Sequence, residues 1–184
     1  SNQKNTHKIC NLCVDLYLKP NLKSKINKRL SFGSKIKVIK KKNNFYKFDT
    51  YWVKKKDVDP VNFTIKEIFR EIKNFKGIKY KWGGKSFNGL DCSALVQIFF
   101  NFNNKFCPRD TKDQIKYFKR KINIKNIRKN DLLFWKGHVA VALSKTRLIH
   151  AYGPLKKVVI MSIFKTIKRI ENTAKLKVIS VRRI

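Results

Sequence analysis

The chain is poor in acidic residues, cysteine and glycine, and it contains no long apolar run. Only 11 of its 184 residues are aspartate or glutamate, against 45 lysines and arginines, which gives a formal net charge of +34. Four cysteines are too few for a disulfide scaffold in a chain of this length. No segment approaches the ~18 uninterrupted apolar residues of a membrane-spanning helix. Because 42% of the residues are hydrophobic, wholesale disorder is excluded, and a chain of one or two globular domains is expected.

The positive charge has two interpretations. It would attract a polyanionic partner such as nucleic acid, an anionic membrane surface or another acidic polymer. However, the lysines run from Lys4 to Lys177 and accompany abundant asparagine and isoleucine, a pattern typical of compositional drift toward A/T-rich codons. Salt-dependent, non-specific binding to polyanions is expected in either case, so the charge alone names no function.

The first residues, Ser1 to Lys8, are polar, and no apolar stretch with a small-residue cleavage site follows them. We expect a cytoplasmic protein whose initiator methionine was trimmed. A periplasmic or secreted protein whose signal had been removed would begin in the same way.

The first third of the chain predicts short strands. Apolar residues alternate over residues 12–18, β-branched residues gather at 36–39, and aromatic residues gather at 45–48 and 51–53. Strands that recur about every ten residues are typical of a small β-barrel.

A helix is predicted next. Asp59-Pro60 breaks the chain, and Thr64 precedes Glu67 by three residues, which is the spacing of a capping box. The apolar residues that follow have helical spacing: Ile65, Ile68, Phe69 and Ile72. A helix over about 65–74 is therefore expected to open a second domain.

The second domain is predicted to be α+β, with a helix packed on an antiparallel sheet. An apolar helix follows Cys92, and a short helix is expected near 114–118. Strand-like runs are found at 132–135, 139–143, 148–151, 158–161 and 176–181, with a helical stretch at 163–170.

Cys92 is the candidate nucleophile. It stands between a glycine-containing turn and an apolar helix, where free backbone N–H groups and the helix dipole favour negative charge. A thiol at such a place is expected to have a lowered pKa, and the same N–H groups can hold an oxyanion. The alternative interpretation is a small buried hydrophobic residue.

Two of the three histidines are candidates for the base. His138 and His150 stand twelve residues apart in two apolar runs joined by a predicted hairpin, so their rings are expected on one face of the sheet. One imidazole could take the thiol proton while the other holds the first ring in the correct orientation. Two ordinary half-buried imidazoles remain the alternative, whereas His7 in the polar terminus is expected to be exposed and idle.

No metal or cofactor is expected. A zinc site built from the two histidines and Cys92 would need a third clustered ligand at short spacing. The pair Cys10 and Cys13 has no second pair to complete a metal site, so we interpret it as incidental, and Cys107 as a packing residue.

Several short motifs follow one another in residues 73–184. They are Tyr80-Lys81-Trp82-Gly83-Gly84, Gly89-Leu90-Asp91-Cys92-Ser93, Cys107-Pro108-Arg109-Asp110-Thr111 with Gln114, Asn130-Asp131, Gly137-His138-Val139 and Leu148-Ile149-His150-Ala151. In order and spacing they resemble the NlpC-type cell-wall cysteine peptidases. The N-terminal pattern resembles the bacterial SH3-like domain that is usual in that family. Ala94 and Asn130 stand where the family usually has glycine.

The resemblance implies a papain-like fold with named roles. Cys92 would be the nucleophile, His138 the general base and His150 the orienting third member, while Tyr80 would help to hold the oxyanion. The predicted domains are an SH3-like barrel over residues 1–60, a linker helix over 61–72 and the peptidase domain over 73–184.

The resemblance also implies a substrate, the stem peptides of peptidoglycan. Asp91, Ser93 and Asp110, with Thr111 adjacent, would contact its free amine. The expected reaction is hydrolysis of the γ-D-glutamyl–diamino acid bond through an acyl-thioester, in murein peptide recycling or cell-wall remodelling, by a monomer. A peptidoglycan amidase or acyltransferase on the same fold, or a basic nucleic-acid-binding module, are the alternatives.

Overall fold

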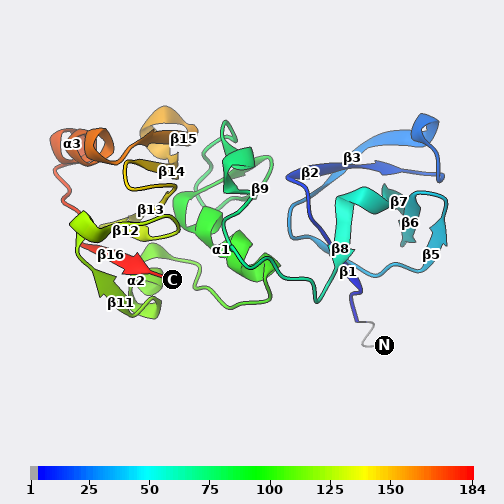
Figure 1. Cartoon of the computed structure of the whole chain (residues 1–184). Helices are drawn as coiled ribbons and strands as arrows, with labels where there is room; N and C mark the ends of the chain where they lie inside the picture. The colour runs from blue at the N-terminus through cyan, green and yellow to red at the C-terminus, as the bar shows by residue number, and fades with distance from the viewer. Residues whose placement is uncertain (1–3) are drawn as a thin grey trace. The chain divides into compact units, whose positions relative to one another are not determined.

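The computed structural model describes residues 4–184, which form two compact units (Figure 1). The first unit runs to Ile65 and includes residues 102–104. The second unit comprises residues 66–101 and 105–184. The domain boundaries given above remain predictions. Among the described residues, no helix has the length and apolar character needed to cross a membrane.

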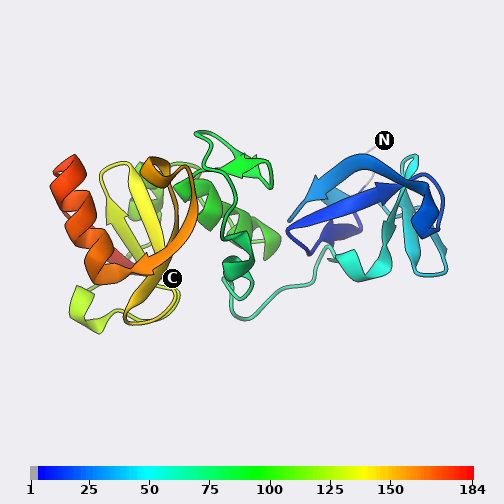
Figure 2. The ribbon, with the colours of Figure 1, turned by 90° about the horizontal axis from the view of Figure 1, so that it is seen from above.

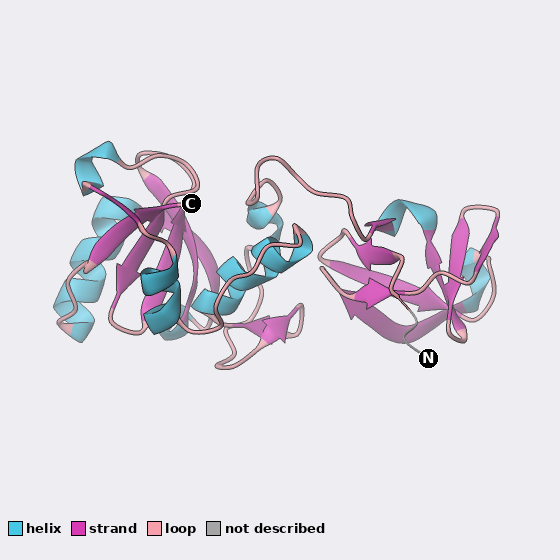
Figure 3. Cartoon of the chain, turned by 90° about the horizontal axis from the view of Figure 1, so that it is seen from below, coloured by secondary structure: helices cyan, strands magenta, loops and turns pink. Residues whose placement is uncertain are grey.

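The first unit consists of two antiparallel sheets and two short 3-10 helices, η1 (Leu22–Ser24) and η2 (Lys55–Asp57), as Figure 3 shows by colour. The smaller sheet has the order β4-β1-β8 and the larger one the order β3-β2-β7-β6-β5. The strands are β1 (His7–Ile9), β2 (Cys13–Tyr17), β3 (Lys25–Ser31), β4 (Lys35–Ile36), β5 (Lys40–Lys42), β6 (Phe45–Phe48), β7 (Tyr51–Lys54) and β8 (Val58–Pro60).

The described strands of the first unit pair as two separate sheets, and no closed barrel is found among them, so the SH3-like barrel stays a prediction. The run at 36–39 does not form one strand. Ile36 ends β4, Ile39 is 56% exposed, and the Val38 N–H donates to the Thr6 hydroxyl. His7 is not fully exposed as predicted, since it lies in β1, half-buried, with its ring edge-on to Tyr46 at 5.3 Å.

The second unit contains a six-stranded antiparallel sheet and three helices. The sheet order is β11-β16-β12-β13-β14-β15, and β9 pairs with β10 in a separate hairpin. The strands are β9 (Lys85–Ser86), β10 (Gly89–Leu90), β11 (Arg120–Ile122), β12 (Leu132–Trp135), β13 (His138–Ala142), β14 (Arg147–Tyr152), β15 (Lys157–Ser162) and β16 (Ser180–Arg183). The helices are α1 (Cys92–Phe102), α2 (Thr111–Tyr117) and α3 (Ile163–Ala174), with 3-10 turns η3 (Ile72–Phe75), η4 (Ile124–Asn126) and η5 (Gly153–Leu155).

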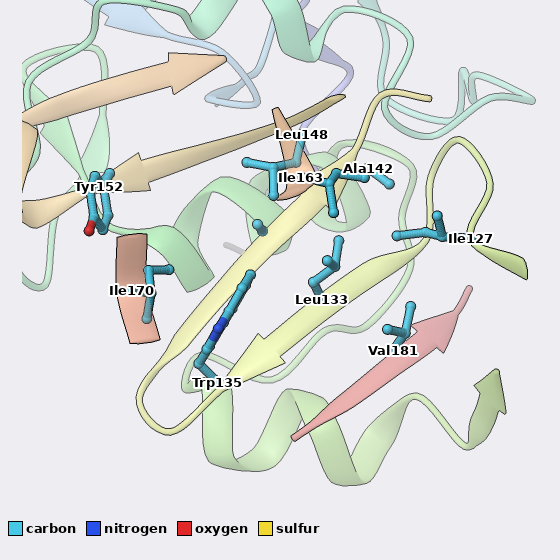
Figure 4. Close-up of a cluster of buried hydrophobic side chains, with 10 residues drawn as sticks. Ile127, Leu133, Trp135, Ala142, Leu148, Tyr152, Ile163, Ile170 and Val181 are labelled. Atoms are coloured by element: carbon cyan, nitrogen blue, oxygen red, sulfur yellow. The ribbon is translucent and has the colours of Figure 1, made fainter. Parts of the chain in front are cut away.

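Strand β12 is apolar along its whole length because both faces of the sheet are covered there. In Figure 2, α3 and α1 lie on opposite sides of the sheet. All four residues of β12 are buried, and Figure 4 shows Leu133 and Trp135 of that strand with Ile163 and Ile170 of α3. Each such side chain contributes roughly 1.5–3 kcal/mol by leaving water. The sheet is therefore a rigid support for the residues at its edges and strand ends.

The helix predicted over 65–74 is wrong, since only the short 3-10 helix η3 forms there. Glu67 pairs with Lys129 instead of serving a capping box at Thr64. The apolar residues of this segment are nevertheless buried, as their spacing suggests. Phe69, for example, is 1% exposed and packs edge-on against Phe99.

The loop before β12 explains why Asn130 replaces glycine without harm. Its φ is +73°, a left-handed conformation that asparagine tolerates better than other side chains do. The next residue, Asp131, is buried and accepts two hydrogen bonds of 2.9 Å from Arg183. This ion pair ties the loop to strand β16.

Candidate active site

The start of helix α1 is fixed by the carboxylate of Asp91, which is 5% exposed. Asp91 Oδ1 accepts a hydrogen bond of 2.8 Å from the Ala94 N–H, which is the geometry of a helix N-cap. Asp91 Oδ2 accepts one of 2.9 Å from the Gly83 N–H. The same side chain therefore joins the glycine turn to the helix that begins with Cys92.

Arg109 completes this arrangement. Its guanidinium binds the Asp91 carboxylate through two nitrogens, at 3.0 and 2.5 Å, and also donates to Ser93 Oγ at 2.8 Å. Burial alone would raise the pKa of Asp91, but the bonds from Arg109 and from the Ala94 and Gly83 amides hold that pKa below its usual value. Asp91 and Ser93 are thus engaged inside the protein, and of the four residues expected at the amine, Asp110 and Thr111 are the ones left open.

Cys92 is buried, with 6% exposure, and its Sγ lies 4.0 Å from the Gly137 carbonyl oxygen. Burial raises the pKa of the thiol to about 11, and a hydrogen bond from the Val139 N–H offsets this only in part. The lowered pKa expected from the helix N-terminus is therefore wrong, because loss of hydration outweighs the helix end. The contacts with Gly137 and Val139 place the sulfur beside the backbone on both sides of His138.

The two histidines are adjacent on one face of the sheet, as their even spacing predicts. His138 Nε2 and His150 Nδ1 lie 2.8 Å apart. His150 Nε2 lies 3.5 Å from the sulfur of Met161, which has no hydrogen to give. Because the Met161 sulfur can only accept, we assign the proton of His150 to Nε2, and His150 Nδ1 then accepts from His138 Nε2–H. This assignment leaves His138 Nδ1 unprotonated and able to act as a base.

Both imidazoles are neutral at pH 7. Burial lowers the pKa of His138 to about 4. Burial, followed by the charge of His138, lowers the pKa of His150 well below its usual value. His150 also stacks on Tyr152, with ring centroids 4.7 Å apart. The site at rest therefore contains a thiol and a neutral imidazole, not an ion pair.

Tyr80 stands at the edge of the same site. Its pKa is raised, first by burial and then by the neighbouring Cys92 and Asp91. A protonated phenol close to the thiol is a hydrogen-bond donor for negative charge that develops there. The ring lies against Gly153, where an added Cβ would be 3.6 Å from it.

A cavity of about 520 Å³ opens at these residues. Its walls include Trp82, Gly83, Asp91, Cys92, Ser93, Arg109, Asp110, Thr111, Lys112 and Gly137. Asp110 is exposed, and its carboxylate makes no hydrogen bond or ion pair with any residue from 4 to 184. An acidic group free to face a bound cation is thus present in the cavity that contains the thiol.

Sequence reasoning missed two residues of the site, Arg109 and Gln114, although both belong to the motif after Cys107. Gln114 is fully buried, and its amide nitrogen donates to the Ser93 and Pro108 carbonyls at 2.9 Å each. Arg109 stands directly before Asp110 in that motif, which was the available signal. Its partner, Asp91, lies 18 residues away in the chain, so the motif alone does not show the pair.

The other cysteines lie outside this cavity. Cys10 is half-buried near the Lys56 carbonyl at 3.7 Å, and burial raises its pKa to about 12. Cys107 is buried, and its carbonyl accepts from Gln97 at 2.9 Å. Within residues 4–184, no three histidine, cysteine or acidic side chains come together as a metal site would require.

The buried histidines make stability depend on pH. Because the pKa of His138 is about 4 in the folded protein and 6.5 is its ordinary value, the unfolded chain binds more protons between these two values. We expect the free energy of unfolding to be highest above pH 6.5 and to fall as the pH decreases toward 4, measured by urea denaturation.

A His138→Gln variant should lose much of this slope. Its comparison with the wild type removes the contributions of His7, whose pKa burial also lowers, and of the carboxylates. Equal slopes in the two proteins would contradict a His138 that is neutral in the folded protein.

Residues 77–174, more than half of the chain, match the NlpC/P60 family. The chain belongs to the NlpC/P60 family. Among curated relatives, it is 31% identical over 153 residues to a γ-D-glutamyl-L-lysine dipeptidyl-peptidase of Bacillus subtilis, covering 75% of this chain and 51% of that protein. It is 40% identical over 72 residues to dipeptidyl-peptidase 6 of Lysinibacillus sphaericus, covering 39% and 27%. This NlpC/P60 chain spans about half or less of the length of these relatives.

Solved structures agree with this assignment. An NlpC/P60 family protein of Bacillus cereus superimposes on 98% of the chain and 63% of its own length, with a TM-score of 0.79 and 21% identity, which shows the shared fold. The peptidoglycan hydrolase RipB of Mycobacterium tuberculosis superimposes on 64% of this chain and 63% of its own, with a TM-score of 0.52 and 25% identity. The two curated relatives are named as dipeptidyl-peptidases, and RipB is named as a peptidoglycan hydrolase.

Proposed function

We propose that this NlpC/P60 protein is a cysteine peptidase that hydrolyses the γ-D-glutamyl–diamino acid bond of peptidoglycan stem peptides. The observations that carry the proposal are two. His138, His150 and Met161 form a connected series, and the Cys92 sulfur lies beside the Gly137 carbonyl and the Val139 N–H, the backbone groups that flank His138. The name of the B. subtilis relative supports the choice of bond.

The chemistry follows from the protonation states. His138 Nδ1 takes the proton of the Cys92 thiol as the sulfur attacks the carbonyl carbon, so the buried thiol need not ionise beforehand. Tyr80 and the free N–H groups at the start of α1 would hold the oxyanion. The leaving amine takes the proton from His138, and a thioester remains on Cys92. Water then cleaves the thioester, with His138 removing the proton of that water.

The free amine of the substrate is assigned to Asp110, with Thr111 adjacent. Both line the cavity. Within residues 4–184 the exposed Asp110 carboxylate makes no hydrogen bond or ion pair, and its only charged neighbour of note is Arg109, whose pKa it helps to raise. A carboxylate facing an ammonium forms a strong, charge-assisted hydrogen bond. Asp91 and Ser93 do not contact the substrate in this proposal, and instead hold the start of α1 in place.

The test is incubation of the protein with L-Ala-γ-D-Glu-diaminopimelate, with products identified by mass. We expect L-Ala-γ-D-Glu and free diaminopimelate, and little or no cleavage of the N-acetylated peptide, because acetylation removes the cation that Asp110 binds. Release of an intact stem from a muropeptide, with no cut inside the peptide, would instead identify an amidase and contradict the proposal.

A further inference from the structure

The first unit contains a second cavity, of about 800 Å³, which shares no residue with the cavity at Cys92. Both sheets of the unit contribute to its walls, for example through Ile36 of β4 and Tyr51 of β7. One lining side chain, Asp49, is acidic. Four are basic, namely Lys28, Arg29, Lys35 and Lys37. A concave surface with this excess of positive charge attracts anions.

The charges of the three lysines are left uncompensated by the part of the chain that the structure describes. Within residues 4–184, no ion pair includes Lys28, Lys35 or Lys37. Arg29 lies 3.4 Å from the Asp15 carboxylate, which also binds a neighbouring lysine at 2.7 Å, so this carboxylate serves two cations. A bound anion would therefore meet positive charge that the fold itself does not neutralise.

The backbone of β3 has an irregularity at the point where it lines the cavity. Asp15 of β2 pairs with Arg29 of β3. The next residue of β2, Leu16, pairs with Ile26, so two residues of β3 are extra, and the second of them is Lys28. Such a β-bulge redirects side chains, and bulges recur beside functional sites. A general excess of lysine in the sequence does not account for this local geometry.

The Lys28 ammonium is held in position before any ligand arrives. Its Nζ donates to the Tyr51 hydroxyl at 2.6 Å and lies over the Tyr51 ring, 5.0 Å from the centroid. This hydrogen bond, together with the charge of Lys28, lowers the pKa of Tyr51. A lysine that is already held loses less side-chain entropy when it binds an anion than a freely moving one does.

The apolar wall indicates what kind of anion fits. Ile39 is 56% exposed, and Leu30 of β3 is half-buried. The Tyr51 ring already has the Lys28 ammonium over it, and Phe48 is tilted against it with ring centroids 6.2 Å apart. Nucleobases stack on open aromatic rings, whereas the methylene groups of an aliphatic chain pack on side chains such as Ile39. The wall therefore favours an aliphatic ligand over a nucleic acid.

We propose that this cavity binds a polyanion whose charges are joined by aliphatic linkers, with the chemistry of a polyol phosphate chain. The basic side chains lie on β3 and around β4, which belong to different sheets, so a chain that crosses the cavity can meet several of them with successive phosphates. Phosphate oxygens accept strong, charge-assisted hydrogen bonds from arginine and lysine. The inference goes beyond the proposed function and does not depend on it.

Binding of a glycerol phosphate oligomer to the full chain, measured by calorimetry at about 0.15 M salt, tests the proposal. In a variant that combines Lys28→Gln, Lys35→Gln and Lys37→Gln, we expect the Kd to rise about tenfold, because three cations that contact the oligomer are lost. An unchanged Kd in this variant would overturn the inference.

The matched control separates the cavity from the net charge of +34. It replaces with glutamine three exposed lysines of the same unit that lie outside the cavity, Lys19, Lys23 and Lys42. Both triple variants lose the same charge, so the control should change the Kd by less than about twofold. An equal loss of affinity in the two variants would show that only the net charge attracts the oligomer, which overturns the inference.

Asp49→Asn tests the site in the opposite direction. It removes the one carboxylate that lines the cavity, and asparagine tolerates the left-handed φ of +46° at this position. We expect the Kd for the oligomer to fall about twofold, a gain in affinity that damage to the fold cannot produce. Weaker binding by this variant would contradict an anion in the cavity.

Two further outcomes identify the ligand class and separate this inference from the proposed function. An oligothymidylate with the same number of phosphates should bind no more tightly than the glycerol phosphate oligomer, and tenfold tighter binding would make the ligand a nucleic acid and overturn the proposal. A chain that binds the oligomer yet cleaves no stem peptide refutes the proposed reaction alone. A chain that cleaves the peptide but binds no oligomer refutes this inference alone.

Discussion

Replacing Cys92 with alanine is expected to abolish hydrolysis, with a loss of roughly 10³-fold or more in kcat, as for removal of other catalytic nucleophiles. The physical reason is that no other thiol lines the cavity, so the covalent intermediate cannot form. The measurement is the rate of release of free diaminopimelate from the tripeptide, followed by mass. The small change in volume at a buried position should leave the fold intact.

Cys13→Ala is the matched control. It removes a half-buried thiol from the first unit and should leave the rate unchanged. Retention of activity in Cys92→Ala at even a tenth of the wild-type rate would contradict a thioester route.

Loss of Arg109 is expected to have the second-largest effect. In Arg109→Met the buried Asp91 carboxylate loses its counter-charge. Because the Arg109 side chain is 31% exposed, the cost should lie below the about 3–5 kcal/mol of a fully buried pair. We expect a corresponding decrease in the free energy of unfolding, measured by urea denaturation. We also expect kcat to fall by about 10²-fold, because the start of α1 and the glycine turn are no longer held together.

The pH dependence of kcat/KM shows whether the loss of activity comes from Asp91 losing its counter-charge. With Arg109 absent, burial dominates and the pKa of Asp91 should rise, so the acid limb of kcat/KM should move to higher pH. Arg109→Lys keeps the charge but not the paired hydrogen bonds. The acid limb of its kcat/KM profile should lie between those of the wild type and Arg109→Met. Arg120→Met removes an exposed arginine of β11 and serves as the control. An Arg109→Met variant with wild-type stability would show that the ion pair contributes little.

Short-range patterns predicted many, but not all, of the elements of the second unit. The apolar helix after Cys92 and the four strands from 132 to 161 occur where apolar periodicity indicates them. The pairing of His138 with His150 could also be predicted, because an even spacing across a short hairpin puts both side chains on one face of adjacent strands at neighbouring register positions.

Properties that depend on packing could not be predicted in this way. The pKa of Cys92 depends on how completely the sheet and the loop at Gly137 cover the sulfur, which no local pattern contains. The partnership of Asp91 with Arg109 joins two loops, so Asp91 looked available for a substrate. Strand β3 was missed because its lysines and asparagine give no apolar alternation, and its position depends on pairing with β2.

The burial of the Cys92 sulfur has a consequence for the chemical durability of the enzyme. Peroxides and alkylating agents attack thiolates much faster than thiols. With a pKa of about 11, almost none of this sulfur is ionised at neutral pH before a substrate arrives. The idle enzyme should therefore survive oxidants that inactivate peptidases whose cysteine is permanently charged, and its reactive form should last only as long as a peptide occupies the cavity.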